Sequence, residues 1–145
     1  MEAATLVAKH LAAHDLRDVT IVAHSKGGLI GKHVMALLDP DARVRDMIAI
    51  ATPFSGSWYA TYLPIPSLHA FAPTDPTTRL LAGITAVNPR ITSIYAEFDP
   101  HIPGGSGLDG AVNVRLPEVG HFRILATPAL LHAVDDALTR SGPTS

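Results

Sequence analysis

The sequence predicts an α/β protein in which a parallel sheet of about four strands is flanked by helices, in one domain spanning residues 1–145. Four short segments with strand character, at 19–23, 44–51, 91–96 and 111–116, alternate with segments of helical character, which is typical of parallel sheets covered by helices. The first run is β-branched and passes through small residues into an amphipathic segment. That succession indicates a buried parallel strand followed at once by a helix.

The composition fits one globular domain and excludes several classes of function. The 145 residues are 47% hydrophobic and 17% charged, with a formal net charge of -2, so a nucleic-acid partner or an anionic membrane surface is not expected. The absence of cysteine excludes a disulfide framework, a cysteine nucleophile and thiolate metal ligands. No apolar run has the length of a transmembrane segment. The first five residues lack a signal-peptide pattern, and a cytoplasmic location is the default expectation.

Helices are expected before, between and after the apolar runs. Residues 3–14 are rich in alanine and leucine and predict the first helix. His10 and His14 lie one turn apart on it, and without a third ligand they indicate a solvated face rather than a metal site. A second helix is expected over 28–38, with Lys32 and His33 as surface groups.

Two further helix starts are marked by capping sequences. Asp75 followed by Pro76 predicts a capped helix that ends at Gly83. Thr127 and Pro128 open a last helix that runs to about residue 139. Its inward-facing side chains are expected to be Leu130, Leu131, Val134 and Leu138.

Residues 54–90 form the least regular part of the chain. The segment is proline-rich and apolar, and its aromatic residues include Trp58, Tyr62 and Phe71. A long loop of this kind predicts a lid or cap-like insertion over a site. The alternative is that these groups simply cover the core, and both readings are compatible.

Three residues with complementary chemistry follow different strands. Ser25 comes after the first apolar run, Asp99 after the third and His121 after the fourth. Because the carboxyl ends of parallel strands meet at one edge of the sheet, these side chains are expected to converge. A hydroxyl, an imidazole and a carboxylate are what nucleophilic acyl transfer requires. Glu97 and Asp109 are rival acids, the first expected to face solvent and the second to serve a turn.

The segment Ala23-His24-Ser25-Lys26-Gly27 resembles the nucleophile elbow of the α/β-hydrolases, in particular lipases and carboxylesterases. Asp99-Pro100-His101-Ile102-Pro103 and Gly120-His121 are similar to the segments that carry the acid and the base in that family. The loop from Thr52 to Ser57, which includes Phe54, is similar to one that borders the family's active site. The chain is therefore identified as a shortened α/β-hydrolase.

This resemblance implies hydrolysis of a hydrophobic carboxylic ester through an acyl-enzyme, with no cofactor and no metal. Ser25 would be the nucleophile, His121 the general base and Asp99 the orienting carboxylate. The backbone N–H of Lys26 would donate to the oxyanion, and Phe54 would contact substrate. The resemblance gives His24 a supporting place, whereas His69 and His101 lie in loops with no evident partner.

The chain departs from the family in its first part. The 145 residues start at the helix before the elbow strand, so we expect neither the family's earlier strands nor the loop that supplies a second oxyanion donor among them, whether they are a whole protein or part of a longer hydrolase. The strand from Val19 to Ala23 is therefore expected at an edge, where it invites pairing into a homo-oligomer. A dimer mate or the 58–71 segment could supply the second donor. Two alternatives to an esterase stay open: an inactive remnant that binds a partner, and an acyltransferase with the same three residues.

Overall fold

The computed structural model describes residues 2–56, 75–140 and 142. Its elements, in chain order, are α1 (Glu2–Ala13), β1 (Val19–His24), α2 (Lys26–His33), the π-helix η1 (Val34–Leu38), β2 (Val44–Ile50), α5 (Pro76–Gly83), the 3-10 helix η2 (Asn88–Arg90), β3 (Ile91–Phe98), β4 (Val112–Val119), the 3-10 helix η3 (Arg123–Ala126) and α6 (Pro128–Arg140). No helix in these ranges is both long enough and apolar enough to cross a membrane.

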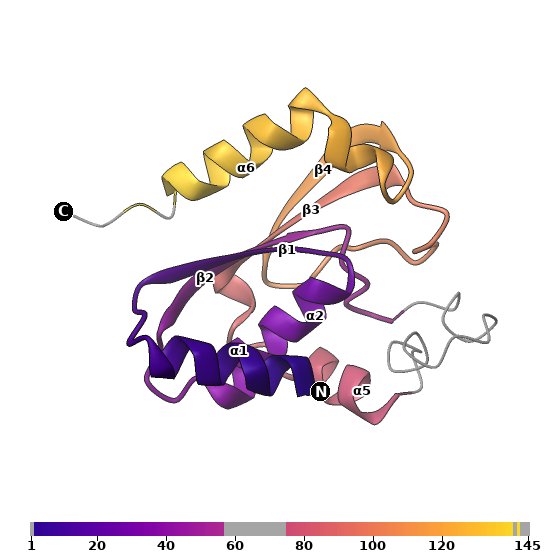
Figure 1. Cartoon of the computed structure of the whole chain (residues 1–145). Helices are drawn as coiled ribbons and strands as arrows, with labels where there is room; N and C mark the ends of the chain where they lie inside the picture. The colour runs from indigo at the N-terminus through magenta and orange to yellow at the C-terminus, as the bar shows by residue number, and fades with distance from the viewer. Residues whose placement is uncertain (1, 57–74, 141, 143–145) are drawn as a thin grey trace.

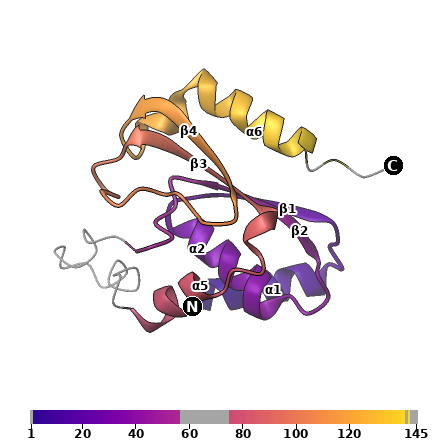
Figure 2. The same ribbon diagram turned by 180° about the vertical axis from the view of Figure 1, so that it is seen from behind.

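The strands form one parallel sheet in the order β1-β2-β3-β4, which confirms the predicted fold class. Helices α1, α2 and α5 lie on one face of the sheet and α6 on the other (Figures 1 and 2). His24 at the end of β1 pairs with Ile50 at the end of β2, and Ile50 pairs with Ile94 of β3. The carboxyl ends of neighbouring strands therefore lie side by side at one end of the sheet. Strand β1 is the first strand in the order, so it has a neighbour on one side only within the described residues.

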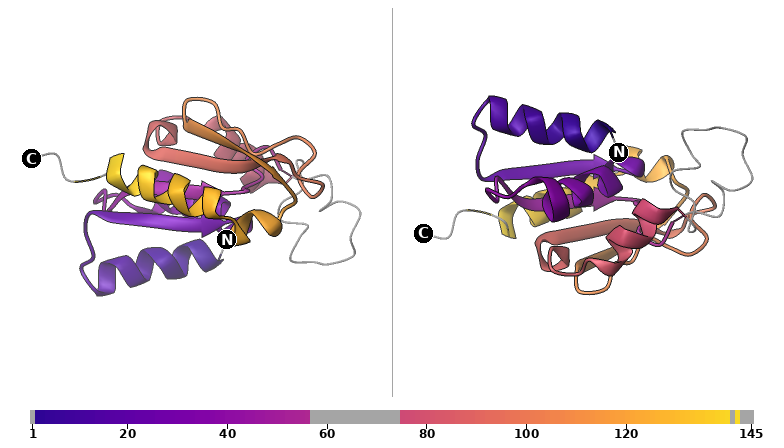
Figure 3. Two further views of the ribbon diagram at one scale, coloured as in Figure 1. Left: turned by 90° about the horizontal axis from the view of Figure 1, so that it is seen from above. Right: turned by 90° about the horizontal axis from the view of Figure 1, so that it is seen from below.

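The hydrophobic core consists of two clusters, one on each face of the sheet. Strand β2 contributes to both, because its successive side chains point to opposite faces: Met47 and Ala49 to the cluster under α1 and α2, Ile48 and Ile50 to the cluster under α6. An interior parallel strand is buried on both sides, which explains why this strand is apolar without interruption from Met47 to Ile50. The views from above and below show α6 across one face and α1 and α2 across the other (Figure 3).

The start of α5 agrees with its predicted cap. Asp75 Oδ1 accepts hydrogen bonds from the backbone N–H groups of Thr77 and Thr78, at 2.9 and 3.0 Å, and Pro76 occupies the first helical position. The predicted lid or cap segment, 54–90, lies partly outside the described residues, because 57–74 are not among them. Its described part contains α5 and η2.

The prediction for the inner face of α6 is wrong for two of its four residues. Leu130 is buried, together with Ala133 and Ala137, but Leu131 is 68% exposed and Leu138 is also exposed. The buried residues form one stripe at helical spacing, and their two alanines let the helix lie close to the sheet. Leu131 and Leu138 are seven residues apart and form a neighbouring stripe that faces away. The helical period alone did not decide which of the two stripes is inside.

The prediction that Lys32 is a surface group is also wrong, since the side chain is 1% exposed. Helix α2 packs closely on the sheet because Gly28 and Gly31 have no side chains: a Cβ at Gly28 would collide with Thr52, and one at Gly31 would lie 2.5 Å from the sulfur of Met47. This approach leaves Lys32 beneath neighbouring groups, with its Nζ 5.8 Å from the centre of the Phe54 ring.

Candidate active site

Ser25 occupies a strained turn between β1 and α2. Its backbone adopts φ 53° and ψ -122°, a conformation rarely populated by residues other than glycine. Two hydrogen bonds hold it there: the Ser25 N–H donates to Ile50 O at 2.8 Å, and Ser25 O accepts from the Gly28 N–H at 3.1 Å. The first ties the turn to β2 and the second to the first turn of α2. The strained serine is thus held by elements that are rigid on both sides.

Asp99 and His121 complete a hydrogen-bonded series with Ser25. His121 Nδ1 lies 2.6 Å from Asp99 Oδ2, and His121 Nε2 lies 2.9 Å from Ser25 Oγ. An ionised carboxylate can only accept, so Nδ1 carries the hydrogen and Nε2 is left to accept from the serine hydroxyl. Asp99 and His121 are each 6% exposed, whereas Ser25 is partly exposed. The structure therefore brings together the three residues that the sequence singled out.

Short backbone connections place His121 beside Asp99. Asp99 directly follows β3, and His121 follows β4 after Gly120, whose φ of 108° favours glycine. The Gly120 N–H donates to Phe98 O at 2.8 Å and holds the end of β4 against the end of β3. His24 acts from β1: its Nε2 lies 3.2 Å from His121 O, and because a carbonyl only accepts, the ring donates. His24 thus supports the backbone of His121.

His101 also lies at this site, although sequence analysis found no partner for it. Its backbone N–H donates to Asp99 Oδ1 at 2.8 Å, and its Nδ1 lies 3.7 Å from the same oxygen. The His101 ring is centred 5.1 Å from the ring of His121. The clue in the sequence was its spacing of two from Asp99, which lets the amide of an Asx turn point back at the carboxylate.

The rival acids are not part of the series. Glu97 is exposed, and its carboxylate lies 3.7 Å from the guanidinium of Arg115. Asp109 is exposed as well, and its backbone carbonyl accepts from Asn88 Nδ2 at 2.7 Å. Among these acids, only Asp99 stands beyond the end of its strand and next to His121.

Comparisons with known proteins agree with this architecture. Neither a family model nor a curated protein matches the sequence. Solved structures do match, and three of them are described here. BpoC of Mycobacterium tuberculosis H37Rv, assigned as a non-heme bromoperoxidase, is 13% identical with a TM-score of 0.68, over 97% of this chain and 74% of that one. The chain has an α/β-hydrolase fold.

Two hydrolases show the same fold. An extracellular α/β-hydrolase from a Paenibacillus species is 14% identical with a TM-score of 0.57, over 97% of this chain and 78% of that one. A hydrolase from Pseudomonas aeruginosa PA01 is 15% identical with a TM-score of 0.57, over 95% of this chain and 69% of that one. The sequence thus retains the α/β-hydrolase fold at very low identity, and the likeness extends over nearly the whole chain.

The two other predicted site residues have different surroundings in this α/β-hydrolase fold. Lys26 is the first residue of α2, directly after Ser25, and its side chain is exposed. Phe54 is 3% exposed and belongs to the core cluster on the α1 and α2 face. Its ring faces the Lys32 ammonium rather than open solvent.

Burial changes the titration of two groups in this region. Removal from water disfavours the charged form of an imidazole and an ammonium, and it lowers the pKa of His24 and of Lys32 below their ordinary values. For His24, the hydrogen bond to His121 O acts in the opposite direction and reduces the shift. A neutral His24 places no second positive charge beside His121 when that ring is protonated.

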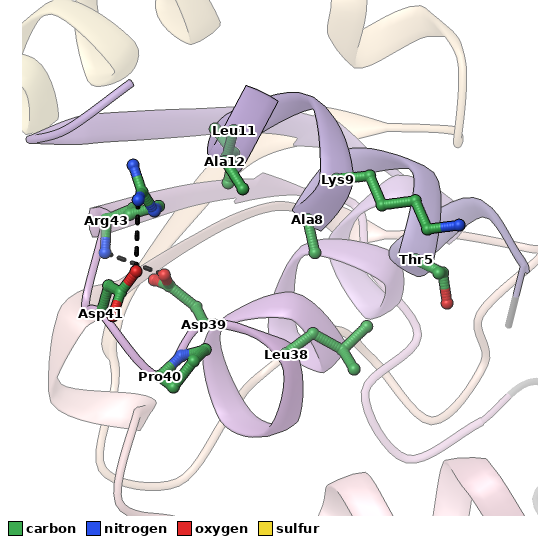
Figure 4. A pocket seen from close by; sticks show the side chains of 10 residues that line it. All are labelled: Thr5, Ala8, Lys9, Leu11, Ala12, Leu38, Asp39, Pro40, Asp41 and Arg43. Atoms are coloured by element: carbon green, nitrogen blue, oxygen red, sulfur yellow. Dashed lines mark hydrogen bonds and ion pairs between the residues drawn. The ribbon is translucent and has the colours of Figure 1, made fainter. Parts of the chain in front are cut away.

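A separate cavity of about 300 Å³ lies at the opposite edge of the sheet, between α1 and the chain that enters β2 (Figure 4). The aspartates and Arg43 on its wall are engaged in short contacts. The Arg43 guanidinium contacts Asp15 at 2.8 Å and Asp41 at 3.2 Å, and the Asp39 carboxylate accepts from the backbone N–H groups of Arg43 and Val44. These contacts close the turn into β2, and the exposed Lys9 is a further charged residue on the wall.

Proposed function

We propose that this chain is a serine hydrolase that cleaves carboxylic esters through an acyl-enzyme. The observation that carries the proposal is the series from Asp99 through His121 to Ser25, with separations of 2.6 and 2.9 Å. The series ends at a serine on a strained strand-to-helix turn, the position from which α/β-hydrolases present a nucleophile. The structurally similar hydrolases support hydrolysis in general, whereas a carboxylic ester as the substrate is our proposal.

The reaction follows from the positions of the protons. Ser25 Oγ attacks the ester carbonyl while His121 Nε2 takes its proton, and Asp99 stabilises the resulting imidazolium through Nδ1–H. Collapse of the tetrahedral intermediate breaks the bond to the leaving alcohol, which receives the proton from Nε2. Water then attacks the acyl-serine, again with His121 as base, and releases the acid and free Ser25.

Lys26 and Phe54 keep the roles that the resemblance gave them. The Lys26 backbone N–H is proposed to donate to the oxyanion, from the positive end of α2 and next to Ser25. Phe54 is proposed to contact substrate by forming part of the wall beneath it, which suits its burial better than direct exposure does.

The surroundings of the series favour an apolar substrate. Phe122 is 64% exposed, yet its ring contacts that of His121 edge-on, with the ring centres 4.9 Å apart. Phe98 and Val119, paired at the ends of β3 and β4, are also exposed. An aromatic group held at the mouth of a site provides area for an acyl or alkoxy chain.

We also propose that β1 pairs with a second copy of the chain. Val22 in the middle of this edge strand is 51% exposed, and an apolar edge with unpaired backbone groups is a template for strand addition.

The first test is hydrolysis of p-nitrophenyl butyrate by the 145-residue chain, beside Ser25→Ala and a matched control, Ser55→Ala, at an exposed serine. Loss of the nucleophile is expected to lower kcat on the order of 10⁶-fold, and the control to leave it unchanged. A fluorophosphonate probe should label the parent and Ser55→Ala but not Ser25→Ala.

Two results would redirect the proposal. A folded sample that neither hydrolyses the ester nor reacts with the probe would favour the partner-binding remnant. Butyrate transferred to an added alcohol in preference to water would favour the acyltransferase.

A further inference from the structure

Within the described residues, Asp99, His101 and His121 form a cluster that can hold a metal ion. Each offers one ligand atom, and the three atoms lie within 4.8 Å of one another. We propose that this cluster binds a divalent transition-metal ion of the zinc class, and that binding switches off the hydrogen-bonded series. Only the effect on hydrolysis rests on the proposed function; the binding site does not.

The ligand set selects the class of metal. Two imidazoles and one carboxylate suit Zn²⁺, Cu²⁺ and Ni²⁺, whereas Ca²⁺ and Mg²⁺ require oxygen ligands. Two ligands of one tetrahedral zinc ion lie about 3.3 Å apart. Asp99 Oδ1 and His101 Nδ1 are 3.7 Å apart, slightly more than this distance. The side chain of His101 is 48% exposed, so an ion in solvent can reach its ring.

The other two ligands are already held in position. The side chains of Asp99 and His121 are 5% and 6% exposed and are fixed by their mutual contact. An ion from solvent therefore meets these two side chains side by side, and binding both atoms would part their 2.6 Å contact, which is shorter than the spacing of two zinc ligands.

Metal binding is incompatible with the series because both ring nitrogens of His121 are in use. Nδ1 contacts Asp99 Oδ2 and Nε2 contacts Ser25 Oγ. An ion on Nδ1 displaces the proton shared with the carboxylate, and an ion on Nε2 occupies the lone pair that accepts the serine proton. Either way, His121 can no longer take a proton from Ser25 while Asp99 holds its ring.

His101 is the one ligand outside the proposed machinery, which makes the inference testable. The hydrogen bond that orients Asp99 comes from the backbone N–H of His101, so it survives a change of side chain. His101→Phe removes the ligand nitrogen and keeps an aromatic ring against Phe122, whose centre lies 5.8 Å away. His14→Phe is the matched control, because the rings of His10 and His14 on α1 are 4.4 Å apart and offer a metal an alternative pair of nitrogens.

The experiment titrates zinc chloride into EDTA-treated protein, with calorimetry for binding, histidine-ring NMR for location and p-nitrophenyl butyrate hydrolysis for effect. We expect one Zn²⁺ per chain, shifts of the His101 and His121 rings, and inhibition that EDTA reverses. His101→Phe should bind Zn²⁺ at least tenfold more weakly and need correspondingly more Zn²⁺ to halve its own uninhibited rate, whereas His14→Phe should behave like the parent.

Three results would overturn the proposal. If His101→Phe binds Zn²⁺ as tightly as the parent, the proposed site is refuted. It is also refuted if His14→Phe is the variant that loses Zn²⁺ binding. If Zn²⁺ binds through His101 but ester hydrolysis is unchanged, the proposed inhibition is refuted. If the chain proves not to hydrolyse esters, calorimetry and ring shifts still decide whether the metal site exists.

Discussion

Replacing Lys32 by methionine should stabilise the protein. The ammonium is on a side chain that is 1% exposed, and no carboxylate among the described residues forms an ion pair with it. Residues 57–74 contain no aspartate or glutamate that could do so. The Lys32 Nζ lies 5.8 Å from the centre of the Phe54 ring. Methionine keeps the apolar stem and removes the charge.

The expected gain can be worked from these contacts. Burying an ammonium without a carboxylate partner costs several kcal/mol after relaxation, and a desolvated cation over an aromatic ring recovers about 2 kcal/mol. The difference predicts that Lys32→Met raises the free energy of unfolding by about 1–3 kcal/mol at neutral pH. For a domain of this size, that corresponds to roughly 2–4 °C in Tm for each kcal/mol.

The gain should depend on pH with a definite sign. Burial lowers the pKa of Lys32 in the folded state, so between that value and the unfolded value near 10.4 the unfolded chain binds more protons. The parent therefore gains stability as pH rises through this window, and the variant does not. The difference in free energy of unfolding between parent and variant should be full below the folded pKa and shrink as pH approaches 10.

Urea unfolding of both proteins between pH 7 and 10 tests this prediction, with Lys9→Met at an exposed lysine of α1 as the control. The control should change stability by less than about 0.5 kcal/mol. A Lys32→Met variant that is less stable than the parent, or a difference that does not vary with pH, would refute the reasoning.

Three other substitutions test the packing of α2 on the sheet, the role of Asp99 and the pairing of β1 with a second copy of the chain. Gly28→Ala should destabilise the fold by about 1–3 kcal/mol in urea, because its Cβ meets Thr52, whereas Gly83→Ala, with no atom within 4 Å of the new Cβ, should not. Asp99→Asn should lower kcat for p-nitrophenyl butyrate on the order of 10⁴-fold by leaving His121 without its acceptor, and an equal loss in Asp109→Asn would contradict the assignment. Val22→Lys should convert a dimer to a monomer by light scattering, and a parent that is monomeric at high concentration would exclude pairing through β1.

The sequence by itself predicted the fold class and the residues that meet at one edge of the sheet. Both depend on local patterns: apolar runs show where strands lie, and the strand-to-helix turn places Ser25. Parallel strands bring their carboxyl ends together, so Asp99 and His121 could be paired with Ser25 although 74 and 96 residues separate them from it in the printed sequence.

Only the tertiary structure decided the neighbours of each side chain. Helical spacing could not show that α6 turns Leu131 outwards, because two adjacent stripes were apolar. Nor could it show that Lys32 is buried, because that follows from how closely two glycines let α2 approach the sheet. His101 reached Asp99 and His121 through the path of a loop. Periodicity determines which residues share a face, but the depth of packing and the meeting of distant loops depend on contacts between segments far apart in the chain.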